Sequence, residues 1–577
     1  MRDELNQRVR HIGVLIAAVA FCVVAQEKEK VPAKPQPKER GVDIPVSATE
    51  ARPAVGQAES HRSELPKIDL PEFVITGIAS IDLPEAEKAS PVEDTGWLPL
   101  VFVDPVAVAR DRNTIEIAVR EKLSVHEVSA PSLNGRLMAS IGTYSTSRVG
   151  LWLGQLNPDY SYLADVEYRS TKGYAPFTNR TGGHLTAQGE IPLRSSSSWL
   201  DGGKAGGFAK YGSHTYRFFG SSTPSLSRTA SDLAFGATLT SSSASPIDYR
   251  AALGFSTLSL SDSSAKTTEN QFSIRVDSWF TVASIPLQSR VQLVTASLSG
   301  SSTGTLPYVE ANVGTQRLWW SNFFAQVSAH FYHAQGMLNQ RLTRAYPRVS
   351  LGYVLSGKST LSVSYRGEVR NGTLSSFVKA CPYLSSASLV QHADVPLDIT
   401  AALESDWNEV WRTRFSGRYR SIREYPLLTE GLQQGIWTMA YFGTTTVITY
   451  ALDLFAKFNS NGYFGLSAAV NSTKNSVTQK KIPYVADFEI TGTYRQTIAP
   501  GFSISPWVSF VDRRSADLIS GLRIPAYVLT GLRTEYALLH SVNFFVDIRN
   551  AADRKYDVWR GYRAEPFMIF AGASYQW

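Results

Sequence analysis

The chain has 577 residues, of which 43% are hydrophobic, 11% aromatic and 19% charged, and its formal net charge is +7. This composition excludes an intrinsically disordered protein, because disordered chains are poor in apolar residues and rich in charge. The weak positive charge comes without a long basic run or a nucleic-acid-binding motif, so we expect no nucleic-acid partner.

Residues 1–25 have the pattern of a secretory signal peptide. Arg8 and Arg10 precede an apolar run over residues 12–24, and Ala25 provides a small residue at the cleavage site. The run is too short for a comfortable membrane-spanning helix, and no later stretch approaches about 18 consecutive apolar residues. The pattern predicts an exported protein without a membrane-spanning helix.

Cysteine and histidine usage predicts no metal site and no cofactor. Cys22 would leave with the signal peptide, so Cys381 would be the single thiol of the mature chain and no internal disulfide could form. His330 and His333 look like a ligand pair, but in a strand their odd spacing places them on opposite faces. We assign no catalytic residues and expect no enzyme; a serine–histidine site formed only by folding, as in an outer-membrane hydrolase, is the weaker alternative.

Residues 26–66 are rich in Pro, Lys, Glu and Ala, which predicts a disordered linker, because such a stretch cannot bury much apolar surface. Residues 67–132 form the next segment, expected in the periplasm, in which the sequence IDLPE occurs twice, at 68–72 and 81–85. Between the repeats lies a short β-prone run. We expect this arm either to bind a periplasmic partner by adding a strand to its sheet, or to dock on the chain's own barrel.

Residues 133–577 alternate apolar and polar side chains in segments of eight to thirteen residues, separated by Gly, Ser, Asn, Asp and Pro. In the segment 542–549, for example, Val542, Phe544 and Val546 fall on one face and Asn543 on the other. This is strand periodicity. A ten-residue strand tilted near 45° covers about 24 Å of membrane thickness, which fits the hydrocarbon band.

The fold class expected from this pattern is all-β: a closed, transmembrane, antiparallel β-barrel of about 22 strands, with 18 or 20 strands as alternatives. A large soluble β protein would also alternate, but it would not need apolar faces so poor in charge. Aromatic clusters near the ends of segments, such as Trp319 with Trp320 and Trp407 with Trp411, suit the girdles at a membrane interface. Outer-membrane lipid is therefore an expected partner.

The stretch WRTRFSGRYR at 411–420 places four arginines on alternate positions and aromatic residues between them. If the aromatic residues face lipid, the arginines face the lumen, where water and counter-charges are available. The preceding segment, 394–404, would place Val395, Leu397, Ile399, Ala401 and Leu403 outside and its acids inside. We predict a luminal charge ladder, with a structural role favoured over an anion path, formed by Arg412, Arg414, Arg418, Arg420, Asp398 and Glu404.

The chain ends in an amphipathic segment with a terminal aromatic residue. Such a last strand resembles the signal read by the barrel-assembly machinery of the outer membrane, which makes that machinery an expected partner. The residues predicted to carry the signal are Phe567, Ile569, Tyr575 and Trp577.

Just upstream, Asn550, Asp553 and Tyr556 match the pattern Asn-Leu-x-Asp-x-x-Tyr that precedes the last strand of TonB-dependent receptor barrels, although Ala551 replaces the usual Leu. The stretch LPEFVITG at 70–77 also resembles the segment that introduces the plug domain of that family. We call residues 71–77 the recognition strand. The resemblance implies that it engages a TonB-like periplasmic protein through Pro71, Glu72, Phe73, Val74, Ile75, Thr76 and Gly77.

A complete plug of the family would need roughly 130 residues, whereas fewer than sixty separate Gly77 from the first barrel-like strand. The resemblance therefore implies a plugless receptor-type barrel in the outer membrane of a Gram-negative bacterium, serving solute transport or envelope interaction. A TonB-coupled importer with a short plug is the alternative. Extracellular loops, such as 378–393 around Cys381, are where specificity for the unidentified solute is expected.

Overall fold

The computed structural model describes residues 135–577, apart from residues 158, 243, 244, 246, 264, 357, 409, 432, 460, 461, 519, 520 and 540. The chain divides into residues 1–58 and 59–577, and every described residue belongs to the second unit. The signal peptide, the linker and the recognition strand predicted above lie outside the described residues.

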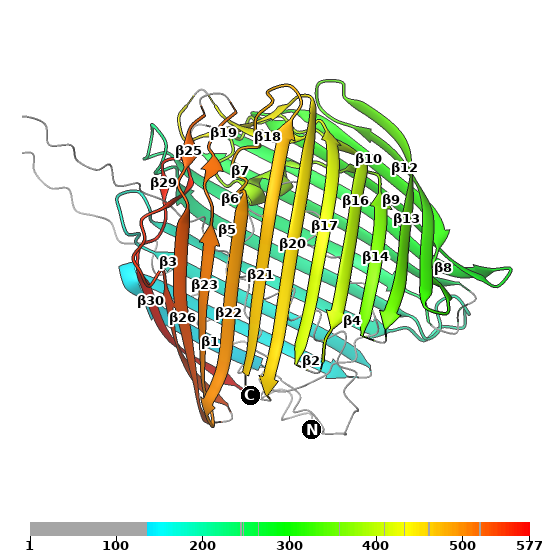
Figure 1. Cartoon of the computed structure of the whole chain (residues 1–577), viewed down its shortest axis with the longest axis horizontal. Helices are drawn as coiled ribbons and strands as arrows, with labels where there is room; N and C mark the ends of the chain where they lie inside the picture. Colours follow the sequence, from blue (N-terminus) through cyan, green and yellow to red (C-terminus); the bar gives the residue numbers. More distant parts are fainter. Residues whose placement is uncertain are drawn as a thin grey trace, which may run out of the picture. The chain divides into compact units, whose positions relative to one another are not determined.

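Twenty-two long strands form one closed antiparallel barrel, as the sequence predicts (Figure 1). Each strand pairs with the next along the chain, and the last pairs with the first, Arg136–Gly142 against Phe570–Gln576. The strands are β1 (Gly135–Gly142), β2 (Thr146–Asn157), β3 (Tyr160–Thr171), β4 (Arg180–Pro192), β5 (Lys204–Arg217), β6 (Ser227–Thr240), β7 (Asp248–Asp262), β8 (Lys266–Val282), β9 (Ile285–Gly300), β10 (Gly304–Thr315), β12 (Phe323–Gln335), β13 (Arg341–Ser356), β14 (Ser359–Arg366), β16 (Ala393–Asp406), β17 (Trp411–Arg423), β20 (Thr444–Asn459), β21 (Gly462–Asn475), β22 (Phe488–Ala499), β23 (Phe502–Val511), β26 (Tyr527–Leu539), β27 (Val542–Arg549) and β30 (Met568–Gln576).

Two short strands extend this sheet at the ends of the barrel: β11 (Leu318–Trp320) pairs with β12, and β15 (Glu368–Arg370) pairs with β16. The barrel is closed, so each of its twenty-two long strands has a partner on both sides. No helix in the described part of the chain is long and apolar enough to cross a membrane.

The two ends of the barrel differ in their connections. At one end, called the turn end, most connections are tight; Ala283 and Ser284, both with positive φ, make the two-residue turn between β8 and β9. At the other end, called the loop end, the connections are longer and include 371–392, 424–443, 512–526 and 550–567. The C-terminus lies at the turn end (Figure 1).

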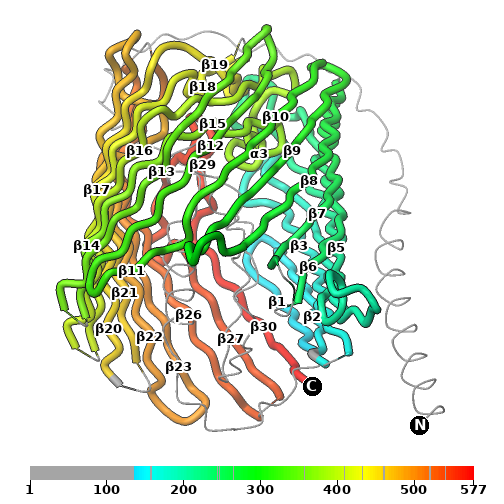
Figure 2. Tube along the Cα trace, turned by 90° about the vertical axis from the view of Figure 1, so that its right-hand side faces the viewer, coloured from blue at the N-terminus to red at the C-terminus, as the bar shows by residue number. Residues whose placement is uncertain are grey.

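The loops of the loop end contain structure of their own. They hold the helix α3 (Leu374–Ala380) and three hairpins, β18 (Pro426–Glu430) with β19 (Trp437–Tyr441), β24 (Arg514–Ser515) with β25 (Arg523–Ile524), and β28 (Asp557–Trp559) with β29 (Tyr562–Arg563). A single 3-10 turn, η4 (Thr143–Ser145), joins β1 to β2. Figure 2 shows β18, β19 and α3 gathered at this end of the barrel.

Side chains alternate along the wall in the way that the sequence pattern predicts. On β17, Phe415 and Tyr419 are exposed on the outer face, while Arg412 and Arg418 carry ion pairs on the inner face. At the turn end, Trp319, Trp320 and Trp407 are exposed, as in an interfacial girdle.

One expected outward residue is placed differently. Val395 is fully buried and belongs to the hydrophobic cluster formed by the loops of the loop end. The reason is a β-bulge: Asp394 pairs with Arg423 but Leu397 pairs with Ser421, so β16 carries one extra residue between them. The alternation expected from Val395 to Leu403 therefore begins only at Leu397.

Candidate functional site

The predicted arginines of β17 lie beside the acids of β16, because the two strands pair antiparallel with Asp398 opposite Arg420 and Glu404 opposite Arg414. Arg418 makes the tightest of these contacts. Its Nε and Nη2 atoms lie 2.8 and 2.5 Å from the two carboxylate oxygens of Asp398. This is the bidentate geometry in which a guanidinium binds a carboxylate most strongly.

The acids of the pairs nearer the turn end are more exposed than Asp398. Arg412 Nε lies 2.7 Å from Asp406, whereas Arg414 Nε lies 3.5 Å from Glu404 and both of these side chains are about one-third exposed. Solvent-exposed pairs of this kind contribute little to stability. Arg420, by contrast, is buried at 8% exposure and sits within the same group of charges as Asp398.

Asp398 also belongs to a wider network than the one expected. Arg366 on β14 approaches Asp398 at 3.5 Å, and Arg370 on β15 approaches it at 4.0 Å. The carboxylate of Glu368 in turn forms ion pairs with Arg370 Nε at 2.6 Å and with Arg366 Nε at 3.2 Å. Arginines of β14, β15 and β17, the strands that flank β16, thus share the carboxylates of Asp398 and Glu368, which fixes the lateral packing of the wall and leaves this part of the lumen positive.

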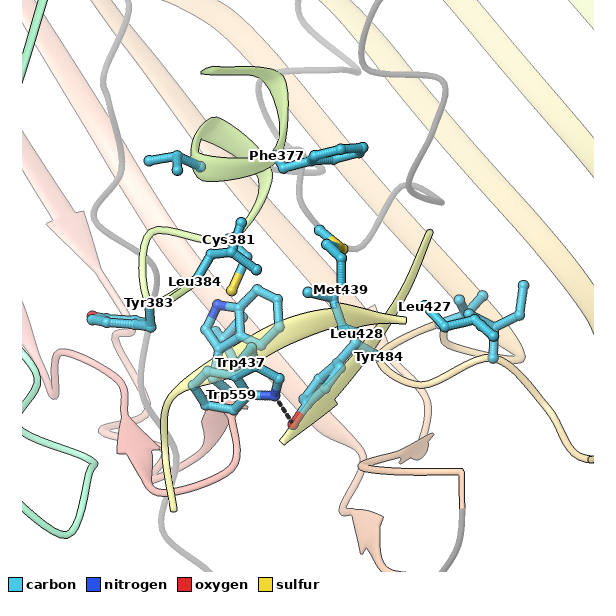
Figure 3. Close-up of a cluster of buried hydrophobic side chains, with 14 of the residues drawn as sticks. Phe377, Cys381, Tyr383, Leu384, Leu427, Leu428, Trp437, Met439, Tyr484 and Trp559 are labelled. Carbon is cyan, nitrogen blue, oxygen red and sulfur yellow. Dashed lines mark hydrogen bonds between the residues drawn. The ribbon is translucent and has the colours of Figure 1, made fainter. Parts of the chain in front are cut away.

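The loops at the loop end fold inward and pack into a hydrophobic core, which we call the outer cap (Figure 3). Its centre is aromatic: the rings of Trp437 and Trp559 lie 5.0 Å apart, and Tyr484 lies 4.6 Å from Trp559. Trp437 Nε1 donates a hydrogen bond to the Tyr484 hydroxyl at 3.0 Å. Tyr383 stacks on Tyr562 with ring centroids 3.7 Å apart. These residues come from four different loops, so the cap joins separate connections into one core.

Residues 371–392, called the bridging loop, contribute α3 and the segment after it to the outer cap. The loop leaves from β15 and returns to β16, yet it makes hydrogen bonds with side chains of β5, β6 and β8, which are distant from both strands in the sheet. Arg228 on β6 carries the centre of this contact. Its Nη1 donates to the carbonyl oxygens of Pro382 and Leu384 at 3.0 and 2.6 Å. Its Nε and Nη2 donate hydrogen bonds to the two carboxylate oxygens of Asp262 on β7.

Other buried wall residues hold the bridging loop in the same way. The carboxylate of Glu269 on β8 accepts hydrogen bonds from the backbone N–H groups of Leu374 and Ser375, the first two residues of α3. An acid at this place satisfies N–H groups that have no partner within the helix. Thr267 donates to Ser386 O, and Tyr216 donates to Pro382 O. The loop is therefore anchored by polar groups that water does not reach.

The segment around Cys381 was expected to be a specificity loop, but the structure buries its centre. Cys381 has no exposed surface, and burial raises the pKa of its thiol well above the ordinary value. A buried, protonated thiol is inert. Large exposed apolar side chains at the loop end lie on its other connections, for example Phe177, Leu338 and Val477.

His392, at the end of the bridging loop, was not singled out in the sequence. It is fully buried, and the backbone N–H of Gly372 donates to its Nδ1 at 3.1 Å. Nδ1 must therefore be unprotonated, which leaves the proton on Nε2, 3.1 Å from the carbonyl oxygen of Gln335. Burial lowers the pKa of His392 to about 4, so the ring is neutral at pH 7.

The motif upstream of the last strand turns the chain at the loop end. Asn550 and Asp553 have positive φ values of 48° and 47°, a conformation that Asn and Asp tolerate better than most residues. The side chain of Asn550 accepts a bond from Arg554 N at 2.8 Å, and that of Asp553 accepts one from Phe567 N at 2.8 Å. Tyr556 is fully buried in the outer cap.

The segment predicted to carry the assembly signal lies in the strand that closes the barrel. Ile569, Tyr575 and Trp577 are partly exposed on the outer face, and Phe567 precedes the strand with similar exposure. Trp577 and Gly135 exchange two backbone hydrogen bonds of 3.1 Å. A side chain at Gly135 would collide with the Trp577 ring, since a Cβ there would lie 2.4 Å from it.

Sequence comparison finds neither a family model nor a curated protein that matches the chain. Structure comparison does find similar proteins. The iron transporter FrpB from Neisseria meningitidis aligns with a TM-score of 0.62 at 8% identity, covering 77% of this chain and 81% of its own. The barrel has the fold of TonB-dependent receptors. The siderophore receptor PiuA from Acinetobacter baumannii (TM-score 0.60, 9% identity, 77% and 81% covered) shares it as well.

The ferric yersiniabactin uptake receptor FyuA from Yersinia pestis also shares this receptor fold, with a TM-score of 0.56 at 10% identity over 77% of this chain and 80% of its own. The structural neighbours are receptors and transporters. The resemblance stated from the Asn550, Asp553 and Tyr556 motif is thus confirmed at the level of the fold.

Proposed function

We propose that the chain is a plugless, receptor-type barrel of a Gram-negative outer membrane that serves solute transport or envelope interaction and is closed at rest by its own loops. The observation that carries this proposal is the bridging loop, which is fixed to the far wall by Arg228 and Glu269. Long loops of such barrels face the outside and short turns face the periplasm. The outer cap would therefore close the extracellular mouth.

The closure differs in kind from that of a plug. A plug is a separate domain, whereas the outer cap is built from connections between neighbouring strands and shares its core with wall residues such as Leu260, Ala296 and Leu306. Moving the bridging loop would break buried hydrogen bonds and expose apolar surface, at about 1.5–3 kcal/mol per large apolar side chain. The resting barrel should therefore conduct little.

Single-channel recording in planar bilayers tests this function. The wild-type protein should show small or no conductance steps, and a variant in which residues 374–389 are replaced by a Gly-Ser linker should show large ones. A matched variant with residues 196–199 replaced in a turn-end connection should behave as wild type. Large steps from the wild-type protein, or no increase in the loop variant, would contradict a mouth closed by the bridging loop.

TonB-coupled import is the second candidate, and the resemblance of residues 70–77 to a plug-introducing segment supports it. The arm would then present Pro71–Gly77 to a TonB-like periplasmic protein by strand addition. A chain lacking residues 68–85 should assemble normally, because the assembly signal lies at the C-terminus, yet it should lose binding to the purified periplasmic domain of TonB. Unchanged binding by the shortened chain would rule out this role of the arm.

A further inference from the structure

Three polar side chains on the luminal face of β10 and β12 form a line. Ser328 and His330 are two residues apart on β12 and therefore share a face. Ser328 Oγ lies 2.9 Å from His330 Nε2, and His330 Nδ1 lies 3.2 Å from Glu310 Oε1 on the neighbouring strand. His330 and Glu310 are buried, at 5% and 8% exposure, whereas Ser328 is only half-buried. The nucleophile thus sits at the accessible end of the line.

The chemistry of the groups fixes the direction of these hydrogen bonds. An ionised carboxylate only accepts, so the proton between His330 and Glu310 belongs to Nδ1. In the neutral ring Nε2 then has a free lone pair, and the Ser328 hydroxyl donates to it. This is the arrangement in which an imidazole can remove a proton from a serine hydroxyl, with a third group orienting the base.

Neighbouring residues hold the acid and the base in place. The Tyr308 hydroxyl lies 3.2 Å from Glu310 Oε2 and 3.1 Å from the carbonyl oxygen of Val369, so its one proton is shared between two acceptors. Asn312 Nδ2 lies 3.4 Å from Glu310 Oε1. The ring of Tyr332 stacks against that of His330 with centroids 6.1 Å apart. These contacts restrict the rotamers of both side chains, as a working base requires.

The position next to Ser328 carries a positive charge, that of Arg348, which is also paired with Glu368 at 3.4 Å. Arg348 on β13 pairs directly with Ser328, and its Nη2 binds the Tyr332 hydroxyl at 2.7 Å. Its buried Nε has no hydrogen-bond partner among the described residues. On the other side Ser328 pairs with Gly314, where a Cβ would lie 2.2 Å from the serine Cβ. Glycine is therefore required there by the close approach of the two strands.

We propose that Ser328, His330 and Glu310 form a nucleophilic site that cleaves carboxylic esters entering the lumen, a hydrolytic activity beyond the transport function. His330 Nε2 takes the hydroxyl proton as Ser328 Oγ bonds to the ester carbon, and Arg348 stabilises the resulting oxyanion. The carbon–alkoxy bond then breaks and the alkoxide takes the proton from Nε2. Water, deprotonated by Nε2, hydrolyses the acyl-serine to a carboxylic acid and restores the hydroxyl.

A serine motif elsewhere in the chain lacks these features. Residues 300–304 read Gly-Ser-Ser-Thr-Gly, which matches the nucleophile pattern Gly-x-Ser-x-Gly. That pattern works on a turn from a strand into a helix, but here it lies between the antiparallel strands β9 and β10. Ser302 is buried and its hydroxyl lies 3.5 Å from the carbonyl oxygen of Ser388. Its role is to hold the bridging loop.

A fluorophosphonate probe tests the site on the full-length protein in detergent. The wild-type protein should be labelled, and S328A should lose at least about tenfold of that labelling, since general-base activation contributes at least this much. S364A is the matched control, because Ser364 faces the same lumen from β14 with no histidine bonded to it in the described structure. Labelling absent from wild type, or equal in S328A, overturns the proposal.

Two further measurements separate catalysis from a structural role. S328C should react with iodoacetamide about tenfold faster than S364C at pH 7, because His330 would stabilise the thiolate, and the double variant S328C/H330Q should lose this advantage. E310Q should lower hydrolysis of p-nitrophenyl acetate and change its pH profile, which a structural role alone would not do. Equal rates for the two cysteines would sink the proposal even if S328A misfolded; heat-modifiable gel mobility reports folding of each variant.

Discussion

The loop end and the middle of the lumen bury polar groups in opposite ways. In the outer cap, isolated wall residues such as Arg228 and Glu269 bind loop backbone, and aromatic rings fill the space around them. In the middle, charged side chains of neighbouring strands bind one another, as Arg418 binds Asp398. The cap therefore depends on single polar anchors, whereas the wall shares its charges over a network. Removing one residue should matter far more in the first region than in the second.

The largest effect is expected from R228M. The methionine keeps most of the volume but leaves Asp262 and two loop carbonyls without their donor, and breaking a buried ion pair costs about 3–5 kcal/mol. The variant should raise channel conductance and expose the bridging loop to added protease. R250M, which removes an arginine near the other end of the same lumen, should leave both unchanged. Equal behaviour of the two variants would remove the distinction between anchor and network.

A pH change should act next, again on the cap. The pKa of His392 is held at about 4, below the ordinary value of about 6.5, because its burial disfavours the charged ring. Because the pKa of His392 is lower in the folded state than in the unfolded state, its contribution to the free energy of unfolding is fully present above pH 6.5. This contribution is lost as the pH falls from 6.5 to 4, by up to about 3 kcal/mol. Conductance should therefore rise as the pH on the loop side falls from 7 to 4. H392Q, which cannot titrate, should lose this dependence; an unchanged dependence would assign it to another group.

The same contrast explains what could be predicted from the sequence. The faces of wall residues can be predicted, because alternation in a strand fixes the face of each side chain, as for Phe415 and Tyr419 on one face of β17 and Arg414 and Arg418 on the other. The strand number and the closed antiparallel sheet followed from that signal. The wall of a barrel is a local pattern repeated many times, and one sequence suffices to read it.

The outer cap could not be predicted in this way. Its aromatic core joins Tyr383, Trp437 and Trp559 from separate loops, and no periodicity links loops that meet only in space. The bulge that buries Val395 could not be predicted from the sequence either, because apolar and polar residues continue to alternate around it. The contact between Glu310 and His330 needed the register of β10 against β12, which no single sequence gives. The signal available in advance was that Ser328 and His330 share a face.

D398N probes the network itself and should have an intermediate effect. The amide keeps the shape of the carboxylate but removes the charge that Arg418 and Arg366 share. Loss of a charged hydrogen bond of this kind costs about 1–3 kcal/mol, and the neighbouring Glu368 should compensate in part. In a barrel opened by loop replacement, reversal potentials should shift toward anions. A shift toward cations would mean that the lumen is not positive at this height.

The smallest effect is expected from R414Q. Arg414 and Glu404 lie 3.5 Å apart and both side chains are about one-third exposed, so water already screens the pair. Exposed pairs contribute about 0–1 kcal/mol, and urea unfolding of the variant should differ from wild type by no more than this. R418Q, four residues along the same face, removes the bidentate contact with a buried carboxylate and should cost more. If R414Q destabilised the barrel as much as R418Q, the burial of the acid would not decide the strength of these pairs, and the ladder would act as one cooperative unit.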